Sequence, residues 1–331
     1  MPRVLLPDVA YGATAVRPGW HDLPPAVRDR IADALHGPIT AARVATGGFT
    51  RTFAAVLETA DGDRAFVKAA PDDDPAARWY AREAAITAAL PPEVSAARPR
   101  WTFSAGGHVV LGLDAIDGRV PALPWSAADL AAALHAWRVA SQALSPPPAA
   151  LAGDELPTLA EILRADLSWW TEILAGRAPM PSGPGWLARR VPELAALEQG
   201  LPALSRGPGM LHGDLRIDNV LVDTDGRAWL CDWTWPCRGA AWFDTVTLLI
   251  TAYASGLDAD ALLEPWQAPA GGVDGALAAL AGYWMVRAGG PATSASPHSR
   301  QHHRFSGRAA LSWLAARRGW PVDDLGAVEQ A

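Results

Sequence analysis

The sequence has very few lysine, asparagine and cysteine residues. Lys68 is the only lysine among 28 Lys and Arg residues, and Asn219 is the only asparagine. Codon bias in a GC-rich genome would explain this scarcity together with the richness in Ala, Arg, Gly and Pro. The two cysteines, Cys231 and Cys237, are too few for a disulfide scaffold and do not form a Cys-x-x-Cys motif. The single lysine and asparagine become informative if both fall inside motifs that carry chemistry.

Long apolar runs and an excess of basic charge are also absent. No segment approaches the roughly 20 apolar residues of a membrane helix, because Asp, Arg or His interrupts the Ala-rich stretches. The opening MPRVLLPDVAYG has too short an apolar run for a signal peptide. A net charge of −7 argues against nonspecific nucleic-acid binding. We expect a reduced, cytoplasmic protein, a monomer or homodimer, whose partner is a small molecule rather than nucleic acid or a membrane.

The first third of the chain reads as a small β-rich unit that ends near residue 114. Residues 22–36 predict an amphipathic helix with Asp22 at its N-cap. Asp74 followed by Pro75 predicts the start of a second helix that runs to residue 90. Strands are predicted at residues 39–46, 52–59, 65–70, 101–105 and 108–116.

The remainder of the chain reads as a larger, mainly helical unit. It opens with Ser126-x-x-Asp129, which predicts a capping box. One short β segment is expected in MLHGDLRIDNVLV, the turn DTDG and RAWLCDW. The length of 331 residues suits two units or one bilobal domain, at roughly 150 residues per domain. Further helices are predicted at residues 158–175, 186–199, 240–255, 273–288 and 300–318.

The stretch LHGDLRIDNVLVDTDGRAWLCDW carries a candidate catalytic and metal site. Asp214 and Asn219 lie five residues apart, and the strand NVLV begins at the asparagine. After the DTDG turn a second strand ends at Asp232, so a hairpin would bring the three side chains together. Two carboxylates and a carboxamide oxygen suit Mg²⁺, which takes few protein ligands together with water and phosphate. The alternative is an ordinary hairpin with polar ends.

The β-rich unit supplies residues suited to phosphate. Gly47 and Gly48 predict a turn whose backbone N–H groups can approach phosphate oxygens, although most Gly-Gly pairs are simple turns. Lys68 falls on the next strand, where its compact ammonium suits phosphate in a way that a planar guanidinium does not duplicate. Glu83 lies on the following helix within reach of Lys68. The alternative for Glu83 is a solvated helix face shared with two arginines.

Together these motifs resemble the aminoglycoside phosphotransferase and choline-kinase-like family, small-molecule kinases with a protein-kinase-like fold. The resemblance runs from about residue 40 to about residue 250. It implies an α+β, bilobal fold: a small N-terminal antiparallel-sheet lobe, residues 1–114, and a larger, mainly helical C-terminal lobe, residues 115–331. It also implies a small-molecule O-phosphotransferase that uses ATP, or GTP, and Mg²⁺.

The resemblance assigns roles to individual residues. Asp214 matches the catalytic base, and Asn219 and Asp232 match metal ligands. His212 and Asp244 fall where residues shape and brace the catalytic loop. Relatives often carry Glu at position 112 or 114, where this chain has Gly and Asp, so the resemblance is weaker at the adenine contacts. The residues expected to bind the nucleotide are Gly47, Gly48, Phe49, Thr50, Lys68, Glu83, Leu113, Asp114 and Ile116.

Two sets of residues predict different acceptors. Kinases of polycationic aminoglycosides present carboxylates, and the helical part offers Asp154, Glu155, Glu161, Asp166, Glu172 and Asp218. WTWPCRGAAWFD and SRQHHRFSGRAALSWLAARRG instead supply aromatic, Arg and His side chains, which suit a neutral or anionic acceptor with a flat ring. The pair His302-His303 in the second stretch is interpreted as a solvated helix start. Candidate acceptor contacts are Arg216, Asp218, Trp235, Arg238 and His303.

The function expected from these observations is phosphoryl transfer to a hydroxyl of a small molecule. Family grounds favour an antibiotic, such as an aminoglycoside or a nucleoside antibiotic of the capuramycin kind, that is inactivated by the transfer. Macrolides, sugars and choline-like amines stay open, so a metabolic kinase is an alternative. A kinase-like binding module without catalysis and a metal-dependent phosphohydrolase are the alternatives from other classes.

Overall fold

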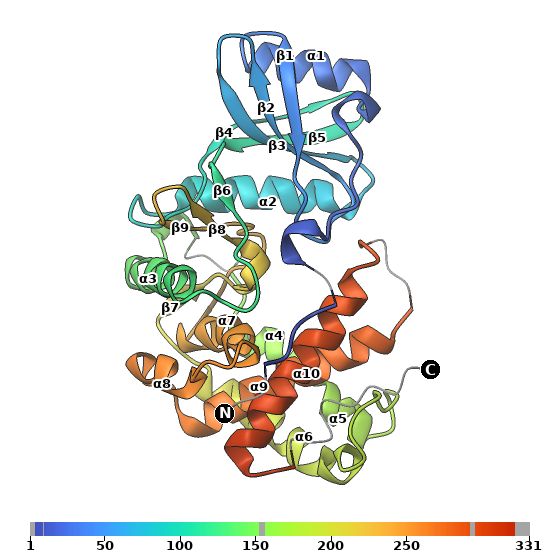
Figure 1. The fold of residues 1–331 in the computed structure, drawn as a ribbon, viewed down its shortest axis with the longest axis vertical. Coiled ribbons are helices and arrows are strands. Elements are labelled where there is room, and N and C mark those ends of the chain that lie inside the picture. The colour runs from blue at the N-terminus through green and yellow to red at the C-terminus, as the bar shows by residue number, and fades with distance from the viewer. Residues whose placement is uncertain (1–3, 9, 152–155, 292–294, 322–331) are drawn as a thin grey trace.

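The computed structural model describes residues 4–8, 10–151, 156–291 and 295–321 and has two lobes (Figure 1). The upper lobe contains a five-stranded antiparallel sheet with the strand order β1-β2-β3-β5-β4. The lower lobe is mainly helical and contains a two-stranded and a three-stranded sheet. The expected α+β, bilobal architecture is therefore present.

The sheet of the upper lobe lies between two helices. Successive side chains along each strand point alternately toward one helix and the other. On β3, Ala65, Val67 and Ala69 are buried on the side of α1 (Pro25–Ala34). Lys68 points to the other side, toward α2 (Pro75–Ala89). The other strands are β1 (Ile39–Val44), β2 (Phe53–Thr59), β4 (Pro99–Ala105) and β5 (His108–Asp114), and β3 itself spans Arg64–Pro71.

The two helices of the upper lobe begin differently from each other. Asp74 caps α2 as predicted, because its carboxylate accepts a hydrogen bond from Ala76 N at 2.8 Å. The cap predicted for the first helix is wrong. α1 begins at Pro25, and Asp22 instead accepts a hydrogen bond from Gly19 N at 2.7 Å within η2 (Trp20–Asp22). Proline is favoured in the first turn of a helix, so the helix starts after the aspartate.

The lower lobe contains the longest helices, and four of the predicted ranges correspond to α6, α7, α9 and α10. One short helix, α8, was not predicted. The α-helices are α3 (Ala127–Ala143), α4 (Leu159–Asp166), α5 (Trp169–Leu174), α6 (Leu187–Leu204), α7 (Trp242–Ala254), α8 (Ala259–Leu263), α9 (Ala270–Gly289) and α10 (Ser299–Arg318). The 3-10 helices besides η2 are η1 (Tyr11–Ala13), η3 (Ala149–Leu151), η4 (Ile217–Asn219) and η5 (Glu264–Trp266).

The range 158–175 does not form the single helix that was predicted. It is divided into α4 and α5, and the buried Glu198 of α6 lies at the division. Its carboxylate accepts hydrogen bonds from Trp170 N at 3.0 Å and from Thr171 N at 2.9 Å. Because the first N–H groups of a helix have no partner inside the helix, a distant carboxylate can start a new one. The spacing of apolar residues within 158–175 does not indicate the contact with Glu198.

The capping box predicted for α3 is half formed. Ser126 Oγ accepts a hydrogen bond from Asp129 N at 3.0 Å, as expected of an N-cap. The carboxylate of Asp129 accepts instead from Arg119 of β6 (Gly118–Arg119), at 3.0 and 3.1 Å. An ion pair with the segment between the lobes therefore replaces the reciprocal bond of the box.

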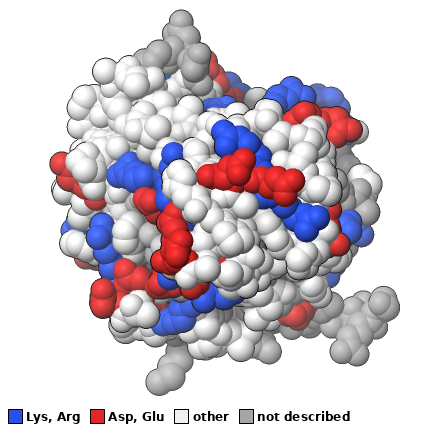
Figure 2. All heavy atoms as spheres, turned by 90° about the horizontal axis from the view of Figure 1, so that it is seen from above, with Lys and Arg blue, Asp and Glu red and all other residues white. Residues whose placement is uncertain are grey.

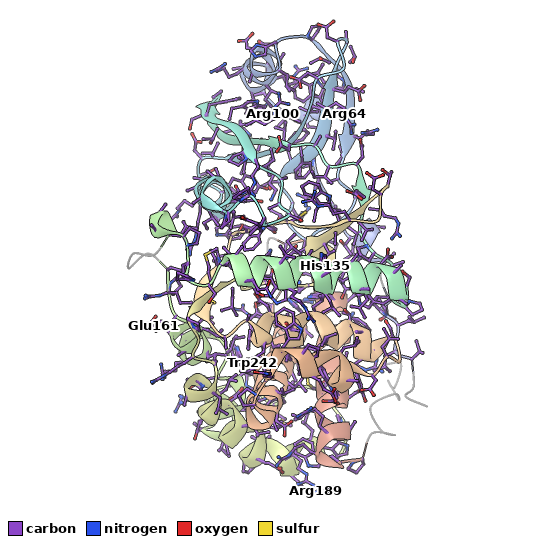
Figure 3. All side chains as sticks on the ribbon, turned by 90° about the vertical axis from the view of Figure 1, so that its left-hand side faces the viewer. Arg64, Arg100, His135, Glu161, Arg189 and Trp242 are labelled. Atoms are coloured by element: carbon purple, nitrogen blue, oxygen red, sulfur yellow. The ribbon has the colours of Figure 1, made fainter. Side chains whose placement is uncertain are left out.

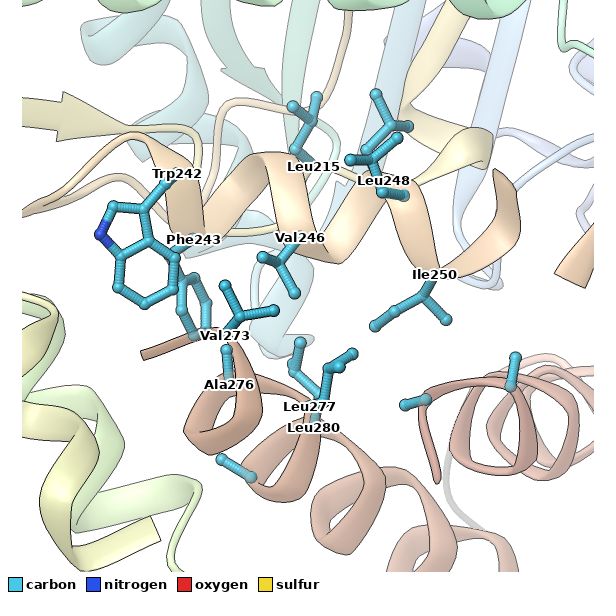
Figure 4. Packing of buried hydrophobic residues seen from close by; sticks show 14 of the residues in the cluster. Leu215, Trp242, Phe243, Val246, Leu248, Ile250, Val273, Ala276, Leu277 and Leu280 are labelled. Carbon is cyan, nitrogen blue, oxygen red and sulfur yellow. The ribbon is translucent and has the colours of Figure 1, made fainter. Parts of the chain in front are cut away.

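The core of the lower lobe is centred on α7. Figure 4 shows Phe243, Val246 and Ile250 of α7 directed toward α9, where they meet Val273 and Leu277. Each side chain of this size contributes about 1.5–3 kcal/mol when it is fully buried. This packing fixes α7, whose first turn carries Asp244.

The small sheets position the loop between them. β8 (Val220–Asp223) and β9 (Ala228–Leu230) form the predicted hairpin, with Val220 opposite Leu230, and β6 extends it. β7 (Gly209–Leu211) pairs with β10 (Cys237–Gly239), a strand that the sequence did not predict. The segment 212–219 is therefore anchored by a strand at each end.

The chain before α1 contacts both lobes. In Figure 1 this dark-blue segment rises from the lower lobe, beside α10, to the upper lobe. Leu5 N donates a hydrogen bond to Ala254 O of α7 at 2.7 Å. Ala15 N donates to Thr46 O, between β1 and β2, at 2.8 Å. The two lobes are therefore joined by a second connection besides the one after β5.

On the face seen from above, the surface of the described residues has no large patch of a single charge (Figure 2). None of the helices in the described ranges combines the length and apolar character that a membrane span needs. Figure 2 shows basic and acidic side chains next to one another on that face. Ion pairs of the upper lobe include Arg64 with Asp117 at 2.6 Å and Arg100 with Asp63 at 3.0 Å.

We predict that Gly282→Ala destabilises the protein although alanine is the better helix former. A Cβ at this position of α9 would lie 2.7 Å from Trp170 Nε1, which is held by a hydrogen bond to Ala278 O. Overpacking of this kind costs about 1–3 kcal/mol. The matched control is Gly200→Ala in α6, where a Cβ meets nothing within 4 Å and should stabilise by up to about 1 kcal/mol. Urea unfolding of both variants tests this, and equal stabilities would contradict it.

Candidate active site

A cavity of about 800 Å³ is lined by residues of both lobes. This volume lies within the usual range for small-molecule sites. Lys68 and Glu83 line it from the upper lobe, and Asn219 and Asp232 line it from the lower lobe. Asp214 lies just outside the lining and is hydrogen-bonded to Asn219. We call Lys68, Glu83, Asp214, Asn219 and Asp232 the polar cluster.

Lys68 contacts two other members of the polar cluster, Glu83 and Asp232. Its Nζ donates to both carboxylate oxygens of Glu83, at 2.6 and 2.8 Å, and lies 3.6 Å from Asp232 Oδ1. The Glu83 side chain is only 2% exposed, so the solvated-face interpretation is wrong. Burial lowers the pKa of Lys68, but the charges of Asp232 and Glu83 raise it above its usual value. The side chain is therefore a cation at neutral pH.

Asp232 combines a strained backbone with an accessible side chain. Its φ of +63° lies in the left-handed region, which is uncommon for a residue other than glycine. Thr234 Oγ1 donates to Asp232 Oδ1 at 2.8 Å, and the side chain is 42% exposed. Strain of this kind persists where the surroundings impose it, and it concentrates at functional sites.

The loop between β7 and β8 is held from below by Asp244. The Asp244 carboxylate accepts hydrogen bonds from His212 N at 2.6 Å and from Gly213 N at 3.3 Å. Gly213 has a φ of +80°, and a Cβ there would lie 1.9 Å from Trp235 O, so only glycine fits. Burial raises the pKa of Asp244 to about 7.

His212 is buried beneath the same loop and uses both ring nitrogens. Nδ1 accepts a hydrogen bond from Asp214 N at 3.3 Å, so the other nitrogen, Nε2, carries the proton and donates to Cys231 O at 2.9 Å. Burial lowers the pKa of His212 to about 4. The imidazole is therefore neutral at pH 7 and joins the loop to the end of β9.

Asp214 contacts Asn219 and Arg216, which follow it in the loop. Asn219 Nδ2 donates to Asp214 O at 2.7 Å and to Asp214 Oδ2 at 3.2 Å. Arg216 Nη1 donates to Asp214 Oδ1 at 2.7 Å, and its other nitrogens bond Asp218. Burial raises the pKa of Asp214 to about 7, against the lowering effect of Arg216.

The polar cluster offers the oxygen ligands that Mg²⁺ uses when it is bound together with nucleotide phosphates. Because Asn219 uses its amide nitrogen to bond Asp214, its carboxamide oxygen is left as the available ligand. Asp232 offers an accessible carboxylate. In the described part of the chain no three His, Cys, Asp or Glu side chains gather as a complete metal site. Mg²⁺ takes one or two protein carboxylates and completes its shell with phosphate and water.

The glycine turn lies at the edge of the cavity, and only its first half lines it. Gly47 and Gly48 are lining residues, and Gly48 has a φ of +88°. Phe49 and Thr50 are not in the lining. The ring of Phe49 packs on that of His302, with a centroid distance of 5.0 Å. The two expected contacts Phe49 and Thr50 are thus placed beside the site rather than in it.

The segment after β5 lines the opposite end of the cavity. Leu113, Asp114 and Ile116 are all lining residues. Asp114 Oδ2 accepts a hydrogen bond from Arg98 N at 3.1 Å, so this carboxylate is engaged by the protein. A Cβ at Gly112 would lie 2.5 Å from the Trp101 ring, which explains why position 112 is glycine.

The candidate acceptor residues do not form one group. Arg216 and Asp218 lie together beside Asp214, and Trp235 abuts Gly213 through its carbonyl group. Arg238 lies on β10, where its backbone N–H bonds Pro157 O, and it is not a lining residue.

The two histidines of α10 are not a solvated helix start. His302 is buried and its Nδ1 is bonded to Tyr11 Oη at 2.8 Å, which corrects that interpretation. His303 is half-buried, does not line the cavity, and packs against Tyr283. Burial lowers the pKa of His303 to about 4.

Sequence reasoning missed Arg17 and Trp79. Arg17 lines the cavity beside Gly48, although it comes from the segment before α1. Trp79 is on α2, one turn before Glu83, and the centroid of its ring lies 5.7 Å from that of the Trp235 ring. The i, i+4 spacing of Trp79 and Glu83 could have indicated a shared helix face. No local pattern marks Arg17.

A model of the phosphotransferase enzyme family matches residues 41–283. The aminoglycoside phosphotransferase APH(4)-Ia, a thermostable mutant in complex with AMP-PNP and hygromycin B, is 12% identical. That match covers 92% of this chain and 100% of that chain, with a TM-score of 0.61. The choline kinase LicA from Streptococcus pneumoniae is 14% identical over 88% of this chain and 99% of that chain, with a TM-score of 0.55. No curated protein sequence matches significantly.

These findings define the class as kinase-like small-molecule phosphotransferases. The chain belongs to the phosphotransferase enzyme family. The resemblance to aminoglycoside phosphotransferases and choline kinases, and the protein-kinase-like fold, are confirmed. At these identities the solved structures establish the shared fold and leave the acceptor open.

We predict that His212 makes the stability of the protein fall in mild acid. Between pH 6.5 and about 4 the unfolded chain binds a proton at this residue and the folded chain does not. The contribution of His212 to the free energy of unfolding is therefore complete above pH 6.5 and is lost as the pH falls toward 4. Its full size is on the order of 3 kcal/mol. Wild type should lose its advantage over His212→Gln in urea unfolding between pH 7 and pH 5, whereas parallel curves would contradict the buried neutral imidazole.

Proposed function

We propose that this protein transfers the γ-phosphate of ATP, or of GTP, to a hydroxyl group of a small-molecule antibiotic in the cytoplasm and so inactivates it. The observation that carries the proposal is the polar cluster at one end of a cavity of nucleotide size. The family supports phosphoryl transfer to a small molecule. The alternative within this class is a metabolic kinase of a sugar or a choline-like amine.

Each member of the polar cluster has a role in this proposal. Lys68, held by Glu83, binds the phosphates with its ammonium group. Asn219 and Asp232 are the residues that would hold Mg²⁺, and His212 and Asp244 keep the loop in shape. The bound ion supplies neutralisation of the charge on the transferring phosphate. Because the cluster is assembled before the substrates arrive, little reorganisation is needed for transfer.

Asp214 orients the acceptor and takes its proton. The acceptor oxygen forms a bond to the γ-phosphorus, the bond from that phosphorus to the bridging oxygen breaks, and ADP leaves. The hydroxyl proton passes to a carboxylate oxygen of Asp214. Arg216 shares one Asp214 oxygen, and Asn219 keeps the side chain oriented. Such a positioned base contributes about 10²–10⁴-fold to the rate.

The carboxylates of the helical lobe give little support to a polycationic acceptor. Asp218 is 1% exposed and is bonded to Arg216, and Glu172 is paired with Arg177 at 2.7 Å. Glu161 bonds Thr158 at the start of α4 and lies on the outside of the lobe (Figure 3). Asp166 is exposed at the end of α4. Asp154 and Glu155 lie outside the described residues.

Aromatic side chains near the catalytic loop favour an acceptor with a flat ring. Trp79 is 37% and Trp235 is 45% exposed, which is unusual for tryptophan. Trp235 follows Asp232 by three residues, and its backbone abuts Gly213. Aromatic faces of this kind bind planar rings at little entropic cost. These observations support a neutral or anionic antibiotic, such as a nucleoside of the capuramycin kind, over an aminoglycoside.

The test is a coupled ADP-release assay over aminoglycosides, nucleoside antibiotics, macrolides, sugars and choline, with mass analysis of each acceptor. We expect one planar acceptor to gain the mass of a phosphate. Asp214→Ala should lower the rate by about 10²–10⁴-fold and leave ATP affinity nearly unchanged. The control is Asp225→Ala, in the exposed turn between β8 and β9. A fully active Asp214→Ala enzyme would refute the base, and phosphate transferred to water alone would favour a hydrolase.

Lys68→Arg should damage the enzyme although it keeps the charge. The ammonium is enclosed by Glu83 and Asp232, and lies 5.4 Å from the Tyr80 ring, so a planar guanidinium cannot take its place. Loss of one charged hydrogen bond corresponds to about 10- to 100-fold in kcat/KM. Arg100→Lys on the upper lobe, the reverse exchange at a residue outside the cavity lining, is the control that should leave kcat/KM unchanged. An unimpaired Lys68→Arg enzyme would count against a phosphate contact.

A further inference from the structure

The segment before α1 reaches the phosphate end of the cavity, although it lies outside the residues matched by the family. Tyr11 Oη is bonded to His302 Nδ1 at 2.8 Å, which fixes the segment to α10. Thr14 Oγ1 donates to Gly48 O at 3.2 Å. These contacts bring Arg17, three residues further on, beside the glycine turn.

Arg17 is a half-buried cation in the cavity wall. Its Nη1 donates to Thr52 O at 3.0 Å and its Nη2 donates to Gly47 O at 3.2 Å. Its Nε is buried without a hydrogen-bond partner. Among the described residues no carboxylate lies within 4 Å of the guanidinium, and both of its bonds go to neutral carbonyl groups.

An unpaired cation in this place needs an explanation. Charged groups that leave water are normally paired, because their desolvation is costly. Burial lowers the pKa of Arg17, while nearby Tyr80 and Asp232 raise it. Holding two carbonyl groups would need only a neutral donor. The guanidinium thus carries a charge that, among the described residues, no carboxylate within 4 Å balances, in a cavity shared with Lys68.

The glycine turn beside Arg17 also has hydrogen-bond donors that are available to an anion. Four consecutive carbonyl groups, of residues 46–49, accept hydrogen bonds from outside the turn: from Ala15 N, Arg17 Nη2, Thr14 Oγ1 and Ser296 N. Within the described ranges, no protein acceptor is bonded to the amides of residues 47–50. The turn has its acceptors occupied and its donors available, which favours a ligand rich in acceptor oxygens.

We propose that Arg17 is a second phosphate contact of the bound nucleotide, opposite Lys68, supplied by the segment before the sheet lobe. The proposal rests on the proposed function, since it takes the cavity to be the nucleotide site. Arg17 lies beside Gly48 and is bonded to Thr52, at the end of the sheet where Phe53 pairs with Ala69. Asp114, next to Leu113, pairs with Ala65 four residues away along β3. Arg17 therefore binds the phosphate groups and not the base. Its planar, multi-donor head can hold the two carbonyl groups and a phosphate at once.

The test compares nucleotides that differ only in phosphate. Calorimetry with adenosine, and with AMP-PNP plus Mg²⁺, gives two affinities for each protein. Arg17→Gln should weaken AMP-PNP binding by about 10- to 100-fold and leave adenosine binding within about twofold. Arg17→Lys, which keeps a cation, should lose less. Arg100→Gln, in the upper lobe and paired with Asp63, is the matched control and should change neither affinity (Figure 3).

The outcomes separate this inference from the proposed function. If wild type binds AMP-PNP and Arg17→Gln binds it equally well, the role of Arg17 is refuted and the proposed function stands. If adenosine and AMP-PNP weaken by the same factor, Arg17 only shapes the turn and the proposal is again overturned. If wild type binds neither ligand, the proposed function itself fails.

Discussion

The buried ion pair between Lys68 and Glu83 is the interaction on which the site depends. It joins β3 to α2 within the upper lobe, and the same ammonium lies 3.6 Å from Asp232 of the lower lobe. Removing one partner of a buried pair leaves an uncompensated charge, which costs about 3–5 kcal/mol. The ammonium of Lys68 therefore links the position of α2, the closeness of the lobes and the charge at this end of the cavity.

In the lower lobe, α7 holds the loop of the site by backbone hydrogen bonds and not by an ion pair. Asp244, at the start of the buried helix α7, binds the backbone of the loop that carries Asp214. Its hold depends on the packing of α7 against α9 (Figure 4). Charge fixes Lys68 and Glu83 in the upper lobe, whereas a core helix fixes the loop of Asp214 in the lower lobe.

The sequence predicted the polar cluster because each member lies in a short motif or on a regular element. The lone Lys68 and Asn219 were the best signals, since composition made them stand out. Contacts between distant residues were not predictable. Glu198 starts α5 from another helix, β10 pairs with β7, and Arg17 reaches the cavity from an irregular segment. None of these has a periodicity or a motif, because each depends on the complete fold.

The segment that begins at Leu5 and passes Tyr11 and Ala15 acts as a mechanical link. It is hydrogen-bonded to α7 and α10 below and to the turn after β1 above, on the phosphate side of the cavity. Two lobes fastened together on one side cannot part there without breaking these bonds. The segment therefore restrains separation of the lobes on this side, in addition to the connection after β5.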